Sequence, residues 1–190
     1  MDEKKFDPKK LKKLNDPDRL LDIPPDYIWN KLNLITSDIL VDIGAGTGFF
    51  SIPFVGYTKN GKVFACDISE IMIEWMKNNI CSKYPRIVPL KMEEQAVPLE
   101  DGLADLVFMI NLHHELEAPM EILKESFRLL KGNGKIFIVD WKKEAMDQGP
   151  PHHLRYLPER VEHQLTEVGF EEVTIDNEMV KHFLVIAQKR

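Results

Sequence analysis

The sequence predicts a doubly wound α/β domain, in which helices cover both faces of a mostly parallel sheet. Apolar strand-like runs alternate with amphipathic helical stretches along most of the 190 residues, until a final pair of strands. The run at 39–43 is apolar apart from Asp42, as expected for a strand buried on both faces. A glycine-rich turn follows this run and leads into a helix. The length suits one domain with a sizeable core.

Seven strands are expected from apolar runs, at 39–43, 62–66, 86–92, 106–110, 135–139, 170–176 and 180–188. About six helices are expected from caps and helical periodicity, at 17–21, 26–34, 49–57, 70–83, 120–130 and 158–168. Pro89 predicts an edge position for the third strand, because proline cannot donate to a sheet. Gly132-Asn133-Gly134 is expected to end the fifth helix, and 144–157 to be an irregular loop.

Composition and charge narrow the class of protein. A net charge of −6 with a pI of about 5.6 argues against a nucleic-acid partner. Two cysteines give no disulfide framework and indicate a reducing compartment. The charged N-terminus and the short apolar runs argue against a leader and a membrane partner. We therefore expect a soluble cytoplasmic protein, with 1–34 as a helical segment of the same domain as 35–190. Residues 1–5 are expected to be a solvated arm, although a lid over the active site is the alternative.

The turn Gly44-Ala45-Gly46-Thr47-Gly48 indicates a nucleotide site. Its three glycines permit positive φ and let a ligand approach bare backbone, and such a turn after a strand marks a nucleotide site at a helix start. The spacing is G-x-G-x-G rather than the dinucleotide G-x-G-x-x-G. Asp42 would repel a diphosphate, and no Lys or Arg lies between Asp38 and Thr58 to offset the charge of a phosphate. The expected ligand is an adenosine cofactor that is cationic at its reactive end.

Asp67 ends the second strand, 19 residues past Gly48. This is close to the spacing at which an acid accepts hydrogen bonds from ribose hydroxyls. The alternative role is a helix N-cap, which Ser69 supplies better. We therefore expect Asp67 to bind the ribose.

The segment from Val41 to Gly48 resembles the first motif of class I S-adenosylmethionine (AdoMet) methyltransferases. The resemblance implies AdoMet as cofactor, an AdoMet-binding domain over 35–190, and a Rossmann-like sheet of order 3-2-1-4-5-7-6 with strand 7 antiparallel. The segment 92–99 is similar to the family's G-D-A-x-x-L-P-F. By that match Glu93 accepts a hydrogen bond from the adenine amino group, and Glu94 offers its backbone N–H to the adenine ring. The cofactor-binding residues implied by the resemblance are Asp42, Gly44, Ala45, Gly46, Gly48, Asp67, Ile68, Met72, Glu93, Glu94 and Asn111.

A closer resemblance rests on three further segments: His113-His114-Glu115-Leu116, Asp140-Trp141-Lys142-Lys143 and Gly149-Pro150-Pro151. Together they are similar to a group of small prokaryotic type 11 methyltransferases, akin to the quinone-biosynthesis C-methyltransferases. In related families, N-rich tetrapeptides mark the methylases that act on amides and bases. This chain has Asn111-Leu112-His113-His114 in that place, which makes protein or RNA a lesser alternative to a small-molecule acceptor.

The candidate catalytic residues are His114, His113 and Trp141. Methyl transfer from a sulfonium mainly requires alignment and exclusion of water, and a base only when the acceptor carries a proton. Either histidine titrates near neutrality, but each is alternatively a hydrogen-bonded structural residue. For His114 we favour a role in shaping the pocket over that of a base. Trp141 either stacks on a substrate or packs under the following loop. A metal site at the histidine doublets is disfavoured, because adjacent residues seldom ligate one ion.

The leading function is therefore an AdoMet-dependent methyltransferase that acts on a small-molecule acceptor. One rival is a noncatalytic AdoMet-binding protein, whose cofactor motifs would be the same. The other is an NAD-dependent oxidoreductase, which Asp42 and the glycine spacing disfavour. No residue pattern indicates an oligomeric state.

Overall fold

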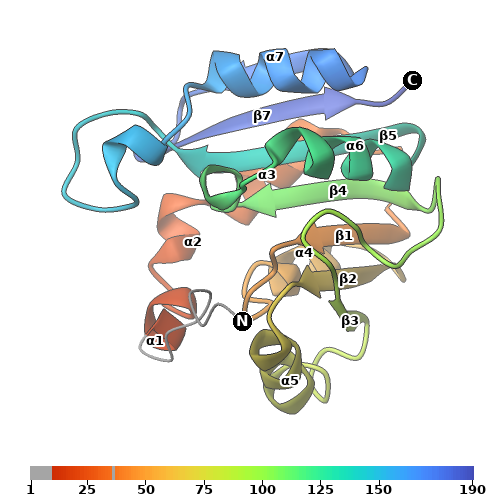
Figure 1. Cartoon of the computed structure of the whole chain (residues 1–190). Helices are drawn as coiled ribbons and strands as arrows, with labels where there is room; N and C mark the ends of the chain where they lie inside the picture. The colour runs from red at the N-terminus through yellow and green to blue at the C-terminus, as the bar shows by residue number, and fades with distance from the viewer. Residues whose placement is uncertain (1–9, 36) are drawn as a thin grey trace.

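The computed structural model describes residues 10–35 and 37–190, and these residues form a seven-stranded sheet (Figure 1). The strand order is β3-β2-β1-β4-β5-β7-β6. Only β7 runs against its neighbours, since it pairs antiparallel with β5 and with β6 while the other pairs are parallel. The strands are β1 (Ile39–Ile43), β2 (Lys62–Asp67), β3 (Ile87–Lys91), β4 (Ala104–Ile110), β5 (Leu130–Trp141), β6 (Glu171–Asp176) and β7 (His182–Gln188). The predicted fold class, strand order and antiparallel seventh strand are confirmed.

Helices cover both faces of the sheet (Figure 1). The helices are α1 (Lys10–Leu14), α2 (Arg19–Asp22), α3 (Pro25–Leu32), α4 (Ser51–Tyr57), α5 (Glu70–Asn79), α6 (Pro119–Leu129) and α7 (Pro158–Val168). One buried cluster packs α3, α4 and α5 against the sheet, and a second packs α6 and α7 against its other face. Every residue of β4 is buried, as expected for a central strand covered on both faces.

One predicted helix end is wrong. Gly132 and Gly134 do not end α6, because α6 ends at Leu129 and both glycines lie within β5. Leu130 already has an extended backbone, with ψ 139°, and pairs with Ala104. The pairing then shifts register before Lys135 pairs with Leu106. The glycines thus lie in an irregular stretch of the strand.

Several other predicted bounds also shift. The helix expected from residue 17 begins at Arg19, because the Asp16 carboxylate accepts from the backbone N–H of Asp18 (3.1 Å) and makes a turn first. The helix α3 ends at Leu32, where Asn33 takes a left-handed conformation with φ 44°. Residues 80–83, expected in a helix, form turns, and part of the loop 144–157 is a short 3₁₀ helix, His152–Leu154. Pro89 lies in the edge strand β3, as predicted.

The fold brings the chemistry-bearing segments to one edge of the sheet. The carboxyl ends of the parallel strands β1, β2, β4 and β5 meet there, where ligands bind in open α/β sheets. His182 at the start of β7 pairs with Trp141 at the end of β5 and so reaches the same edge. The solvated arm expected for residues 1–5 lies outside the described residues. In the described part of the chain no helix is long and apolar enough to cross a membrane.

Candidate active site

The glycine turn after β1 has the backbone that only glycine adopts readily. Gly44, Gly46 and Gly48 have φ of 72°, 57° and 71°. A Cβ on Gly44 would lie 2.7 Å from the side chain of Leu112, which would have to shift to make room for it. The backbone N–H groups of Gly44 and Ala45 both donate to the Cys66 carbonyl at 2.9 Å. The end of β2 therefore holds the turn in place.

Asp67 joins this turn to the start of α5. One carboxylate oxygen accepts from the Gly46 N–H (2.8 Å) and the other from the Ser69 N–H (2.8 Å). Burial raises the pKa of Asp67, against the hydrogen bonds that favour its charged form. Ser69 caps α5 by accepting from the Met72 N–H, as expected. Each oxygen of Asp67 keeps acceptor capacity, because a carboxylate offers about four lone-pair sites.

Asp42 lies buried beneath the glycine turn, with 3% of its surface exposed. The Ser51 hydroxyl at the start of α4 donates to it at 2.6 Å. Burial raises the pKa of Asp42 to about 7, and the nearby Asp67 adds to the effect. A carboxyl group with this pKa favours a cationic ligand, which would stabilise its charged form.

The pKa of Asp42 predicts a pH-dependent affinity for the cationic cofactor that the sequence leads us to expect. Because the cation favours the carboxylate, affinity should fall by up to about tenfold between about pH 8 and pH 6, and Asp42→Asn should flatten this dependence. The folded pKa lies above the unfolded value, so the stability that protonated Asp42 contributes is lost as pH rises through about 7. Asp42→Asn should therefore raise the unliganded melting temperature at alkaline pH. Calorimetry and thermal unfolding measure the two effects, and an affinity independent of pH in the unaltered protein would rule out the role of Asp42.

Arg19 of α2 is a residue that the sequence analysis missed. Its guanidinium lies 5.4 Å from the Phe49 ring centroid and 4.7 Å from that of Phe50, just after the glycine turn. It donates to the Leu14 carbonyl at 2.5 Å, and the Leu14 side chain lies 3.9 Å from the place of a Cβ on Gly46. Burial lowers the pKa of Arg19 to about 10, while Asp42 opposes this effect. The first two helices thus bring a partly buried cation to the glycine turn, and no sequence spacing indicates it.

Glu93 and Glu94 lie exposed in the loop 92–103, between β3 and β4. The loop leaves the sheet beside the ribose candidate, because the Met92 N–H donates to the Asp67 carbonyl at 3.1 Å. Met72 is buried in the first turn of α5, and Ile68 is half-buried just before it. The predicted cofactor residues of β2, α5 and this loop therefore lie on neighbouring elements.

Buried polar atoms without a partner gather at this same edge. Among the described residues they are Thr47 Oγ1, Asn111 Oδ1, His113 Nδ1 and both ring nitrogens of His182. Thr47 lies in the glycine turn, and Asn111 follows β4 with φ 56°. Buried polar atoms are normally hydrogen-bonded, so each unpaired one calls for an explanation. The unpaired atoms of Thr47, Asn111 and His182 lie at the carboxyl edge, which therefore offers polar groups to a ligand, whereas His113 turns toward α7.

His114 and Asp140 form a hydrogen-bonded pair at the ends of β4 and β5. Nδ1 of His114 lies 2.7 Å from one oxygen of Asp140, and its backbone N–H donates to the other at 2.9 Å. Their side chains are 6% and 2% exposed. Burial lowers the pKa of His114, but the hydrogen bond and the charge of Asp140 outweigh it and leave the pKa raised. Asp140 therefore occupies Nδ1 of His114. The other ring nitrogen, Nε2, lies 3.7 Å from the Glu115 carboxylate.

His113 points elsewhere. Its Nε2 lies 2.9 Å from the side-chain oxygen of Gln164 on α7, and its ring meets Tyr156 edge-on at 4.9 Å. The residue is fully buried, and burial lowers its pKa. These contacts hold the His113 ring against α7, so the two neighbours in the sequence have different surroundings.

The ring of Trp141, the last residue of β5, lies between His182 of β7 and the loop that follows β5. Its ring is 4.3 Å from that of His182, and a Cβ on Gly149 would lie 2.7 Å from the indole, so the loop backbone packs closely on it. The buried Arg155 holds this loop, donating to the carbonyls of Lys142, Glu144, Gln148 and Pro150. A hollow of about 650 Å³ is lined by residues 144–152 and Arg155. The loop packs against the tryptophan, which stays partly exposed.

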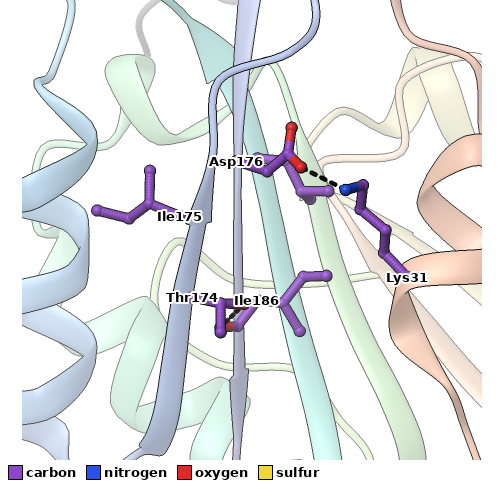
Figure 2. A pocket seen from close by; sticks show the side chains of 6 residues that line it. Lys31, Thr174, Ile175, Asp176 and Ile186 are labelled. Atoms are coloured by element: carbon purple, nitrogen blue, oxygen red, sulfur yellow. Dashed lines mark hydrogen bonds and ion pairs between the residues drawn. The ribbon is translucent and has the colours of Figure 1, made fainter.

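A second hollow lies away from these residues. Figure 2 shows it between α3 and the β6–β7 hairpin, where Lys31 Nζ lies 2.6 Å from an Asp176 oxygen. Its volume is about 300 Å³, and none of the residues lining it belongs to the predicted site. Over the described ranges, no group of three or more His, Cys, Asp or Glu residues could hold a metal ion.

Comparisons with known proteins identify the family. A family model described as a methyltransferase domain matches residues 41–138, more than half of the chain. A crystal structure of a SAM-dependent methyltransferase from Aquifex aeolicus is 33% identical with a TM-score of 0.89, over 98% of this chain and 100% of that one. The chain belongs to the class I AdoMet-dependent methyltransferases. This methyltransferase therefore has AdoMet as its cofactor, and the alternative of an NAD-dependent oxidoreductase is excluded.

Two curated relatives differ in what they act on. The methyltransferase is 28% identical to ubiquinone/menaquinone biosynthesis C-methyltransferase UbiE of Chromobacterium violaceum, over 61% of this chain and 50% of the relative. It is 27% identical to tRNA(Phe) (4-demethylwyosine(37)-C(7)) aminocarboxypropyltransferase of Methanocaldococcus jannaschii, over 69% of this chain and 51% of the relative. The predicted kinship with the quinone-biosynthesis enzymes is confirmed. The methyltransferase spans about half the length of these relatives.

Proposed function

We propose that this protein transfers a methyl group from AdoMet to a small-molecule acceptor that carries a proton, and that His114 removes the proton. The observation that carries the proposal is the pair of His114 and Asp140. Asp140 accepts from the Nδ1–H of His114, which leaves the lone pair on Nε2. The second hydrogen bond, which the backbone N–H of His114 donates to the same carboxylate, holds the main chain that carries the ring. A base oriented by a carboxylate in this way is a recurring arrangement in proton abstraction.

The residues at the carboxyl edge fit AdoMet. When bound, AdoMet supplies a methyl group on a positively charged sulfur. Asp42 favours a cationic ligand, and the spare lone pairs of Asp67 suit ribose hydroxyls. The unpaired oxygens of Thr47 and Asn111 offer polar contacts beside the bare glycine backbone. Arg19 adds a positive charge at the same place, suited to the carboxylate at the methionyl end of the cofactor.

An acceptor such as a phenol, enol or activated carbon acid suits this base. The pKa of His114 is raised, so Nε2 is a stronger proton acceptor than an ordinary imidazole. The contact with Asp140 now favours the base over a role in shaping the pocket alone. Burial of both side chains keeps water from the proton that is transferred. Trp141 and His182 lie beside Asp140 and are our candidates for contacts with the acceptor.

The net charge of −6 supports a small acceptor over a polyanion. Methyl-labelled AdoMet incubated with a panel of phenols, quinols and other carbon acids should yield a labelled small molecule. A second arm should contain transfer RNA and protein. Label in RNA or protein alone would contradict the small-molecule proposal, and AdoMet binding without label in any arm would favour the noncatalytic alternative.

A further inference from the structure

An ion pair on α6 fastens the loop 92–103 to the body of the protein. Glu125 and Arg128 lie one helical turn apart and meet in a two-point contact. The Nε of Arg128 donates to one oxygen of Glu125 and Nη2 donates to the other, both at 2.7 Å. Such forked contacts fix geometry as well as charge.

The same two side chains hold the backbone of the loop. Glu125 accepts from the Val97 N–H at 2.6 Å, and Arg128 donates to the Val97 carbonyl at 3.0 Å. Arg128 also donates to the Leu99 carbonyl at 2.8 Å and to the Asp101 carboxylate at 2.6 Å. The N–H of Gly102 donates back to the Arg128 carbonyl at 2.9 Å. One turn of α6 therefore holds the whole second half of the loop.

The short turn 93–96 lies between two fixed points. On one side the Met92 N–H is bonded to the Asp67 carbonyl, and on the other Val97 is bonded to Glu125 and Arg128. Met92 and Val97 are each 3% exposed, so both flanks are also packed in the core. Within the turn, the Glu93 N–H donates to the Ala96 carbonyl at 3.0 Å. The place of Glu93 and Glu94 is thus set by these flanks.

We propose that Glu125 and Arg128 are positioning residues that set the adenine specificity of this site through the turn 93–96. The inference rests on the proposed function, and on the contacts to the adenine ring that the family resemblance implies for Glu93 and the backbone of Glu94. Neither Glu125 nor Arg128 needs to touch the cofactor. Because hydrogen bonds weaken steeply when misaligned, a small shift of this turn would lose the contact to the adenine amino group.

The charges of the pair persist at neutral pH. Burial works against the charge of Glu125, but the hydrogen bonds from Arg128 and Val97 outweigh it and lower its pKa. The hydrogen bond to Glu125 raises the pKa of Arg128. The pair therefore holds the loop across the neutral range.

The same helix offers a matched control. Glu121 and Lys124 have the same spacing and lie 2.8 Å apart, with side chains 46% and 59% exposed. In the described structure no hydrogen bond joins either side chain to the loop. Removing this pair tests the loss of an ion pair from α6 without a change in the loop.

The test compares S-adenosylhomocysteine with S-inosylhomocysteine, in which a carbonyl oxygen replaces the adenine amino group. In calorimetry, Arg128→Met should weaken binding of the adenosine compound by about tenfold and leave the inosine compound little changed. Arg128→Lys should restore part of the preference, and Lys124→Met should leave it intact. Glu125→Gln, which keeps an oxygen for the Val97 N–H, carries the same test if Arg128→Met does not fold.

A preference for adenine that stays unchanged in Arg128→Met and Glu125→Gln would overturn the inference. So would equal weakening of both compounds, which is the result for a purely structural pair. An unaltered protein that binds neither compound would instead overturn the proposed function, so the two failures are distinguishable.

Discussion

Replacing His114 with glutamine is expected to lower the turnover rate by about 10²–10⁴ while AdoMet affinity stays unchanged. Glutamine still reaches Asp140 with an N–H group but has no basic nitrogen, so orientation is kept and proton removal is lost. Steady-state rates with an acceptor from the panel and calorimetry with AdoMet measure the two quantities. The neighbouring histidine is the matched control. His113→Gln should lower the melting temperature, because its ring packs on Tyr156 and α7, and should leave the pH profile of the rate unchanged.

Other outcomes for His114→Gln identify other roles. A raised Michaelis constant for the acceptor with turnover little changed would show that His114 shapes the pocket. A loss of stability with both kinetic constants following it would show a structural histidine. Either result would contradict the proposal that His114 acts as the base.

Replacing Asp67 is expected to weaken AdoMet binding by about 1.5–3 kcal/mol, the range for hydrogen bonds to a charged group. Asp67→Asn keeps the size of the side chain and one acceptor oxygen, so the Gly46 contact persists while the charge is lost. Asp67→Ala removes the contacts with Gly46 and Ser69 as well, and should weaken binding further. Calorimetry measures both. Unchanged affinity in Asp67→Asn and Asp67→Ala alike would mean that the ribose is held elsewhere.

The two variants also separate binding from folding. Burial raises the pKa of Asp67, so its charge opposes folding as pH rises through that pKa. Asp67→Asn should therefore leave the unliganded protein as stable or more stable at alkaline pH, while AdoMet affinity falls. A variant that unfolds would instead assign Asp67 a structural role.

Local patterns were enough to predict the strands and the glycine turn, whereas the order of the strands in the sheet came from the family resemblance. A strand buried on both faces needs an apolar run, as in β1, and the turn after it needs residues that accept positive φ. The wrong end of α6 shows the limit of such patterns. Gly132 and Gly134 are common helix stops, but pairing of Leu130 with Ala104 begins the strand before them.

The site was predicted only in part, because its decisive contacts join distant segments. His114 and Asp140 were both named, but their pairing spans 26 residues and depends on β4 lying beside β5. Arg19 lies beside the glycine turn only because the fold packs α2 against the residues that follow that turn. The sequence analysis does not single out Glu125 and Arg128, since nothing in their spacing points to Val97. Single-residue types suggest chemistry, and the tertiary fold decides which of them meet.

The pH profile of the unaltered protein tests the central claim most directly. Turnover is measured at saturating AdoMet and acceptor between about pH 6 and pH 9. We expect the rate to rise with pH through a single limb whose midpoint lies above 6.5, the ordinary value for histidine, because Asp140 raises the pKa of His114. A turnover rate that stays flat across this range would contradict a base at His114.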